Sequence, residues 1–241
     1  MALFSPKCPV GPQERVWMEE SIAWLAAEFG GEVLMRDPVL PTAEFFPGRY
    51  AGSDADIRNL IIQICGYLDV APNRLTIEIE PDDGEDVMVA ELRLAHKSRS
   101  AAGHYRRENG RPVIAIDQRQ ATRPTSLVAT IAHELGHVRL LDEQRITIDR
   151  SDHEPLTDLL TVYFGLGIFT ANSAFNFNQN SQGWSYSRLG YLNEHMLGYA
   201  LACYAHLRGE TKPAWARHLD TNPRAYLKQS LRYLAHNPLN I

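Results

Sequence analysis

The sequence predicts an α+β protein, in which a small and mostly antiparallel sheet is followed by a mainly helical second half. Two observations lead to this class. Apolar and charged residues alternate in places between residues 75 and 117, as in half-buried strands, and apolar residues recur at helical spacing after Pro124. Because strands and helices are separated along the chain, α+β fits better than a parallel α/β fold.

The first 70 residues are expected to form two helices joined by a loop. Residues 14–29 have an amphipathic pattern that ends at Gly30 and Gly31. The side chains expected on its buried side are Trp17, Ile22, Leu25 and Phe29. Residues 38–53 are rich in proline and glycine and are expected to form a loop, and a second helix is expected over residues 54–68.

Extended stretches are predicted next. Residues 75–80 (LTIEIE) alternate between apolar and charged side chains, and residues 87–94 (VMVAELRL) form a second candidate strand after an acidic turn. Within residues 103–117, Asn109–Gly110 separates two further extended runs. This dipeptide favours a tight hairpin turn, because both of its residues tolerate positive φ.

Composition excludes several classes of protein. The net charge of the 241 residues is −5, and the 24 Lys and Arg residues are spread along the chain, so no nucleic-acid partner is expected. The three cysteines are far apart in sequence, which is typical of free thiols in a reducing compartment. The chain has no apolar run long enough to span a membrane and no leader pattern at its start, so a cytoplasmic location is expected.

One segment carries residues that point to metal chemistry. His133–Glu134–Leu135–Gly136–His137 is an H-E-x-x-H pattern. On a helix, His137 lies about 40° and Glu134 about 100° around the axis from His133. The bulky apolar residues lie nearly opposite: Leu127, Ile131, Leu135 and Val138. Two imidazoles one turn apart can bind one zinc ion, and Glu134 can reach a metal-bound water. The alternative is a pair of hydrogen-bonded surface histidines.

Small residues on the histidine side of this helix, Ser126 and Ala129, are expected to leave open space above the histidine pair. A catalytic zinc site usually has a third protein ligand. The metzincin pattern is excluded, because Leu140 and Glu143 occupy the positions of its required glycine and histidine.

The third ligand is expected downstream. Glu154 and Asp158 are four residues apart at the start of another apolar helix, so they share a face. Glu154 is the first candidate. The rival candidates are Asp149, Asp152 and His153. Ser151-x-x-Glu154 also fits a capping box, and Asp158 fits an acid favoured by the helix dipole.

H-E-x-x-H followed by E-x-x-[ST]-D on a second helix resembles the gluzincin clan of zinc metallopeptidases, the thermolysin-like group, over residues 125–158. The short linker is closer to the compact members. The resemblance implies a zincin-like fold with an α+β lobe over residues 1–141, a helical lobe over residues 142–241 and a cleft between them. It also implies that strand residues 112–117 border this cleft and offer an open edge to an extended substrate.

For the site itself, the resemblance implies Zn²⁺ bound by His133, His137 and Glu154. Glu134 would be the general base, and Asp158 would orient a ligand histidine.

Such a peptidase also needs a hydrogen-bond donor for the oxyanion that forms on the substrate carbonyl. Tyr191, His195 and Tyr199 are spaced four apart, so they form one stripe on a predicted helix. His195 is the first candidate and Tyr191 the second, because relatives often place a His or Tyr from the later helical part there. A stripe that packs against the body of the protein is an equally good interpretation.

The sequence therefore predicts a zinc-dependent metallopeptidase that acts on a peptide or protein substrate with Glu134 as general base. A zincin-like protein that binds metal but cleaves little, and acts in regulation or protein interaction, is the alternative. It is favoured by the lack of an evident pro-segment to restrain a cytoplasmic peptidase. The third hypothesis is a metal-free scaffold in which the motif is a coincidence.

Overall fold

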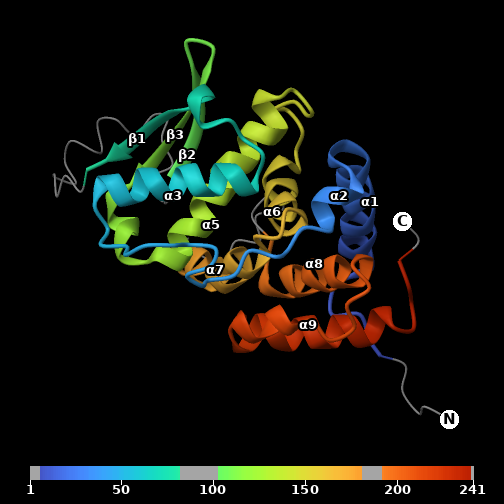
Figure 1. Ribbon diagram of the computed structural model, residues 1–241. Coiled ribbons are helices and arrows are strands. Elements are labelled where there is room, and N and C mark those ends of the chain that lie inside the picture. Colours follow the sequence, from blue (N-terminus) through green and yellow to red (C-terminus); the bar gives the residue numbers. More distant parts are fainter. Residues whose placement is uncertain (1–5, 82–102, 181–191, 240–241) are drawn as a thin grey trace.

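The computed structural model describes residues 6–81, 103–180 and 192–239, with only the backbone for residues 175–180. In Figure 1, helix α3 (Asp54–Tyr67) lies in front of a small sheet, and α5 (Pro124–His137) runs behind α3. Helices α8 (Glu194–Leu207) and α9 (Thr221–Leu234) form a layer below them. The described part is α+β and mostly helical, which confirms the predicted class at this level.

The two N-terminal helices form where the sequence predicts them. Helix α1 spans Pro12–Phe29 and is followed by Gly30 at φ 82°, and the short α2 spans Gly31–Leu34. Helix α3 begins after Ser53, whose hydroxyl accepts the backbone N–H of Asp56 in a capping box. The apolar sides of α1 and α3 face a shared core, with these residues buried: Ile22, Leu25, Phe29, Ile57, Leu60, Ile61 and Ile64.

The described sheet has the strand order β1-β3-β2. Strands β2 (Gly103–Glu108) and β3 (Arg111–Asp117) form the predicted hairpin, with Asn109 and Gly110 at φ 50° and 79°. Strand β1 (Thr76–Glu80), however, pairs in parallel with β3. The sheet is therefore mixed rather than mostly antiparallel. The predicted strand over residues 87–94 lies outside the described residues.

Strand β3 is the central strand, because β1 pairs with one side of it and β2 with the other. The prediction that residues 112–117 offer an open edge is therefore wrong. The physical reason lies in the sequence of β3, where Val113 to Ile116 are all apolar and buried. A continuous apolar run is typical of a strand covered on both faces.

A 3₁₀ turn at Pro72–Arg74 precedes β1, and a second at Gln118–Thr122 follows β3. The described elements after this second turn are all helical. Helix α5 continues into a π-helical turn at Val138–Asp142, and α6 (His153–Tyr163) and α7 (Gly167–Asn180) follow. A further 3₁₀ turn at Ala214–His218 lies between α8 and α9.

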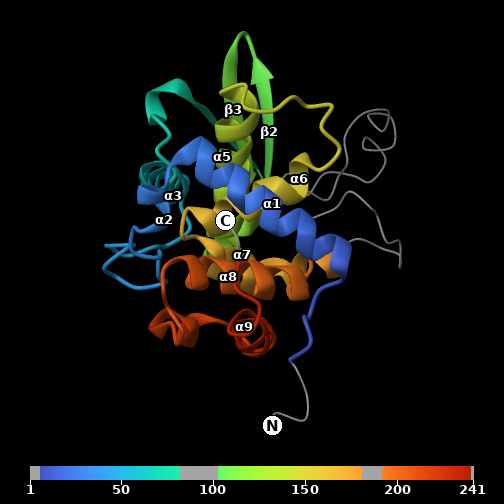
Figure 2. The same ribbon diagram turned by 90° about the vertical axis from the view of Figure 1, so that its right-hand side faces the viewer.

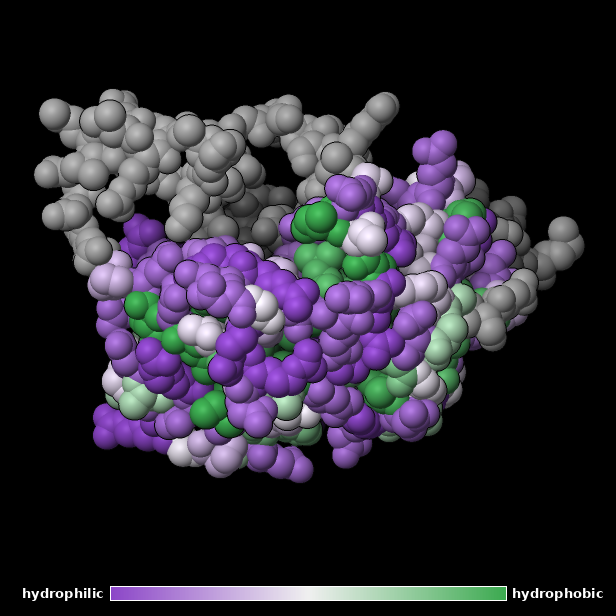
Figure 3. Space-filling view, turned by 90° about the horizontal axis from the view of Figure 1, so that it is seen from above, coloured by the Kyte–Doolittle hydropathy of each residue, from purple (hydrophilic) through white to green (hydrophobic). Residues whose placement is uncertain are grey.

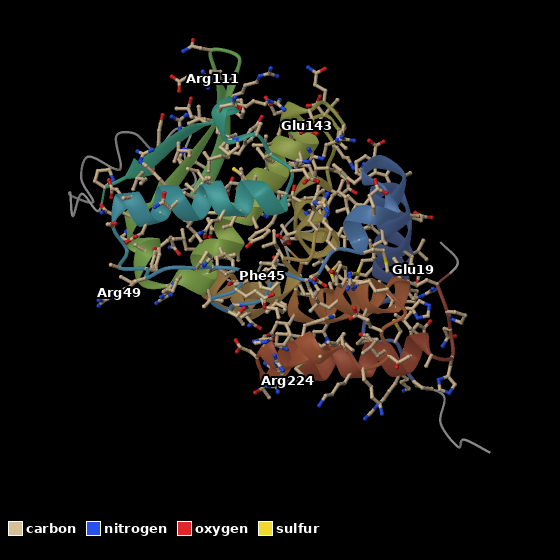
Figure 4. All side chains as sticks on the ribbon, viewed as in Figure 1. Glu19, Phe45, Arg49, Arg111, Glu143 and Arg224 are labelled. Atoms are coloured by element: carbon tan, nitrogen blue, oxygen red, sulfur yellow. The ribbon has the colours of Figure 1, made fainter. Side chains whose placement is uncertain are left out.

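Helix α1 packs across this helical half (Figure 2). The indole N–H of Trp17 donates to Asp152 at 2.7 Å, and the Tyr199 hydroxyl donates to Glu19 at 2.6 Å, with Glu19 labelled in Figure 4. One hydrophobic core extends from α1 to α9. The division into lobes at residue 141 stays a prediction.

The face seen in Figure 3 is mainly hydrophilic where described residues are visible, with apolar side chains between the polar ones. No helix in the described ranges has the length and apolar character needed to cross a membrane. Cys8, Cys65 and Cys203 are free thiols, as their spacing predicts.

Candidate metal centre

Helix α5 is buried on every side around the H-E-x-x-H residues. Each residue from Leu127 to Val138 is buried, and β2 and α6 cover the side that carries the histidines. On this side of the helix, β2 packs against α5. A Cβ added to Gly103 would lie only 2.8 Å from Cγ2 of Thr130, so the strand backbone itself packs on the helix. The surface of α5 at Thr130 therefore faces a strand.

Three ligand atoms from two helices converge at this place. Glu154, in the first turn of α6, directs Oε2 to Nε2 of His133 at 3.0 Å and to Nε2 of His137 at 3.5 Å. All three donor atoms lie within 4.8 Å of one another. Ligands at 2.0–2.1 Å from a tetrahedral zinc ion are separated by about 3.3 Å. The three residues thus have the donor types and the spacing to hold a metal ion.

A glycine brings the two helices close enough for this convergence. A Cβ at Gly136 would lie 2.7 Å from Cγ2 of Thr157, which shows how closely α6 packs on α5 at the level of the histidines. The Glu154 side chain, which starts on α6, can therefore reach nitrogen atoms on α5.

Asp158 contacts the ring nitrogen of His133 that faces away from Glu154. Its Oδ1 lies 2.9 Å from Nδ1 of His133, and its Oδ2 accepts the backbone N–H of Leu192 at 2.9 Å. Because Nδ1 is engaged by Asp158, Nε2 is the nitrogen that faces Glu154. This is the contact expected for Asp158.

The rival ligands make other contacts. The N-cap of α6 is Asp152 rather than Ser151, so the capping-box alternative for Glu154 does not apply. Asp152 accepts from Arg150 at 2.6 Å and from Trp17, and Asp149 is exposed. His153 places Nδ1 2.8 Å from the Arg150 carbonyl and Nε2 3.2 Å from Oε1 of Glu154. His153 therefore contacts Oε1 of Glu154, whereas His133 and His137 face Oε2.

Glu134 is buried beside the triad, with 6% of its surface exposed. Burial, together with the charges of Glu154 and Asp158, raises the pKa of Glu134 to about 7, although His133 and the backbone N–H of Tyr105 act in the opposite direction. A carboxyl group whose pKa lies near neutrality can both accept and release a proton at neutral pH.

The charges at the centre are strongly coupled. Burial lowers the pKa of His133, but the hydrogen bonds with Asp158 and Glu154 outweigh it and raise this pKa to about 10. Burial raises the pKa of Glu154, but His133 and His137 hold it far below its usual range. Burial and the charge of His133 lower the pKa of His137. In the absence of a cation, the positive charge of protonated His133 balances part of the negative charge of the carboxylates that contact it.

No family model matches the chain. Comparisons with curated proteins and with solved structures also found no match.

Of the proposed oxyanion donors, His195 lies within the described residues and Tyr191 does not. His195 is exposed at the start of α8, and its ring lies 4.0 Å from that of Tyr226 on α9. Tyr199 is buried and bonded to Glu19, which fits the packing interpretation of the stripe. Tyr191 is not among the described residues. The role assigned to His195 and Tyr191 stays a prediction.

Sequence reasoning missed two residues at the site. The ring of Tyr105, on β2, lies 5.8 Å from the ring of His137. The hydroxyl of Thr157 lies 3.3 Å from Nδ1 of His137. Thr157 is the residue before Asp158 in the E-x-x-T-D pattern, so the sequence motif could have indicated that it lies beside the histidines. No motif indicated Tyr105, because its position near His137 depends on the order of the strands, which no local sequence pattern specifies.

Proposed function

We propose that the protein is a zinc-dependent metallopeptidase. The observation that carries the proposal is the convergence of His133, His137 and Glu154, with Glu134 buried next to them. Two imidazole nitrogens and one carboxylate oxygen are a donor set typical of catalytic zinc, which keeps a fourth position for water or substrate. The resemblance of the H-E-x-x-H and E-x-x-T-D residues to gluzincins supports the same activity.

The chain's own residues supply acid–base chemistry and orientation. A zinc ion bound there would polarise a substrate carbonyl and acidify a bound water. Glu134 would accept a proton from the water whose oxygen bonds to the carbonyl carbon. It would deliver this proton to the amine nitrogen as the C–N bond breaks, a role that suits its pKa of about 7. Asp158 keeps Nδ1 of His133 engaged and so directs Nε2 toward the ion.

Metal content tests the site. Wild-type protein, purified without affinity-tag metals and supplied with zinc, is expected to hold about one zinc per chain, and Glu154→Ala is expected to lose it. Glu143→Ala is the matched control, since Glu143 is also partly buried and ion-paired but faces Arg139 and Arg145. A wild-type protein that binds no zinc would contradict the proposal at its first step.

Turnover tests the activity. Wild-type protein is expected to cleave members of a peptide library, and Glu134→Gln is expected to reduce the rate by about 10² to 10⁴-fold while zinc remains bound. Mass spectrometry of the library and metal analysis of both proteins give the two readouts. Zinc binding with no turnover by the wild type would refute the peptidase and leave the metal-binding protein that the sequence offers as an alternative.

A further inference from the structure

Thr157 makes three contacts at the centre that the proposed chemistry does not use. It is fully buried in α6. Its hydroxyl donates to the backbone carbonyl of His153 at 2.7 Å and lies 3.3 Å from Nδ1 of His137. Its methyl group faces Gly136 across the close approach of the two helices. Both the hydroxyl group and the methyl group of Thr157 therefore have close neighbours that fix the side chain.

The direction of the Thr157 hydroxyl proton favours one tautomer of His137. A hydroxyl group has a single proton, and the His153 carbonyl can only accept, so the proton of Thr157 points to that carbonyl. Toward His137 the same oxygen can only accept. A hydrogen bond between this oxygen and His137 therefore needs the hydrogen on Nδ1, which leaves a lone pair on Nε2, 3.5 Å from Oε2 of Glu154.

We propose that Thr157 is a positioning residue, which sets the tautomer and ring orientation of His137 before a metal ion arrives. The inference rests on the metal site of the proposed function and not on peptidase activity. Thr157 and Asp158 are consecutive in α6, and each engages Nδ1 of one histidine. Together they direct both Nε2 atoms to the same side. A threonine is suited to this task, because its β-branched side chain is stiff at χ1.

Two substitutions separate the hydroxyl from the shape of the side chain. Thr157→Val keeps the shape and removes the acceptor, whereas Thr157→Ser keeps the acceptor and removes the methyl group. Thr161→Val is the matched control. Thr161 is also fully buried in α6, and its hydroxyl also donates to a backbone carbonyl, that of Asp158, but its other partner is Thr170 rather than a histidine.

The first readout is the tautomer of His137 in metal-free protein, from the ¹⁵N shifts of labelled histidine, with His137→Gln used for assignment. We expect the Nδ1–H form in wild type, in Thr157→Ser and in Thr161→Val, and a shift toward the Nε2–H form in Thr157→Val. The second readout is zinc affinity, which we expect to fall about 10- to 100-fold in Thr157→Val and little in the other two variants. Circular dichroism confirms that each variant is folded.

The outcomes distinguish this inference from the proposed function. A wild type that binds no zinc refutes the function, but the tautomer measurement still decides the role of Thr157. An unchanged tautomer in Thr157→Val overturns the inference, whether or not the protein cleaves peptides. A loss of affinity as large in Thr157→Ser as in Thr157→Val also overturns it, because packing of the methyl group would then be the cause.

Discussion

His133 lies between two carboxylates, with Asp158 at 2.9 Å from Nδ1 and Glu154 at 3.0 Å from Nε2. Its pKa of about 10 means that the metal-free protein carries an imidazolium there at neutral pH. A cation bound by Nε2 of His133 would have to displace this proton and would then lie opposite Glu154. The site is thus held in shape by an ion pair before any metal binds.

Removing the charge of Asp158 should weaken both metal binding and the fold. In Asp158→Asn, the neutral amide is a poorer partner for His133, and the backbone N–H of Leu192 loses its charged acceptor. We expect zinc affinity to fall about 10- to 100-fold and the free energy of unfolding to fall by about 1–3 kcal/mol. Isothermal titration and urea unfolding measure the two effects.

Asp152→Asn is the matched control for this prediction. Asp152 is also hydrogen-bonded near the start of α6, but its partners are Arg150 and Trp17. It should keep the zinc affinity of the wild type. If Asp158→Asn also kept that affinity, the orienting role of Asp158 would be wrong.

At the scale of single residues, the sequence predicts a side chain well when its helical phase is known. His133 and His137 follow from the phase of α5, and Glu154 follows from its place one turn before Asp158. What the phase leaves open is the choice between a cap and a ligand for Glu154, which depends on how closely α6 packs on α5. The contact of His195 with Tyr226 is equally non-local, because it depends on the packing of α8 on α9.

The contact between α5 and α6 depends on Gly136. A methyl group there would lie 2.7 Å from Cγ2 of Thr157, and both helices would have to separate. We expect Gly136→Ala to destabilise the fold by up to about 2 kcal/mol, because an overpacking cost of about 1–3 kcal/mol is only partly offset by the gain of about 1 kcal/mol in helix propensity. It should also weaken zinc binding, since Glu154 moves with α6. Thermal unfolding and zinc titration provide the measurements.

Gly66→Ala is the matched control within α3. A Cβ at Gly66 would meet nothing within 4 Å, so only the propensity term remains and the substitution should stabilise the protein by up to about 1 kcal/mol. Equal effects of the two substitutions would mean that the helix contact at Gly136 has no special role.

The sheet shows where element-level prediction ends. Alternation locates β1, and the Asn109–Gly110 turn fixes the β2–β3 hairpin, because both signals are local. The parallel pairing of Thr76 with Val113 joins residues far apart in sequence. No pattern within β1 specifies the direction of its neighbour, and only the continuous apolar run of β3 indicated a central position.

For the molecule as a whole, buried thiols and phenols should limit stability at alkaline pH. Burial raises the pKa of Cys65 and of Tyr204 to about 12 each and raises that of Cys203 as well. In the unfolded chain these groups ionise at about pH 9–10. The unfolded state therefore loses protons first, so the stability is complete below about pH 9 and falls as the pH rises toward 12.

For Cys65 alone, this difference corresponds to about 2 kcal/mol at pH 10.5. Urea unfolding between pH 8 and 11 should show the decline, and Cys65→Ala should reduce its slope more than Cys8→Ala, since Cys8 is only half-buried. A free energy of unfolding that stayed constant up to pH 11 would contradict the prediction.

The contacts of α1 have a consequence for the order in which the structure assembles. The pairs Trp17–Asp152 and Glu19–Tyr199 are separated by 135 and 180 residues in sequence, whereas His133 and Glu154 are separated by only 21. Closing a short loop costs less chain entropy than closing a long one, and contacts between distant residues slow folding. We therefore expect the helix pair that carries the histidines and Glu154 to form before α1 docks on it.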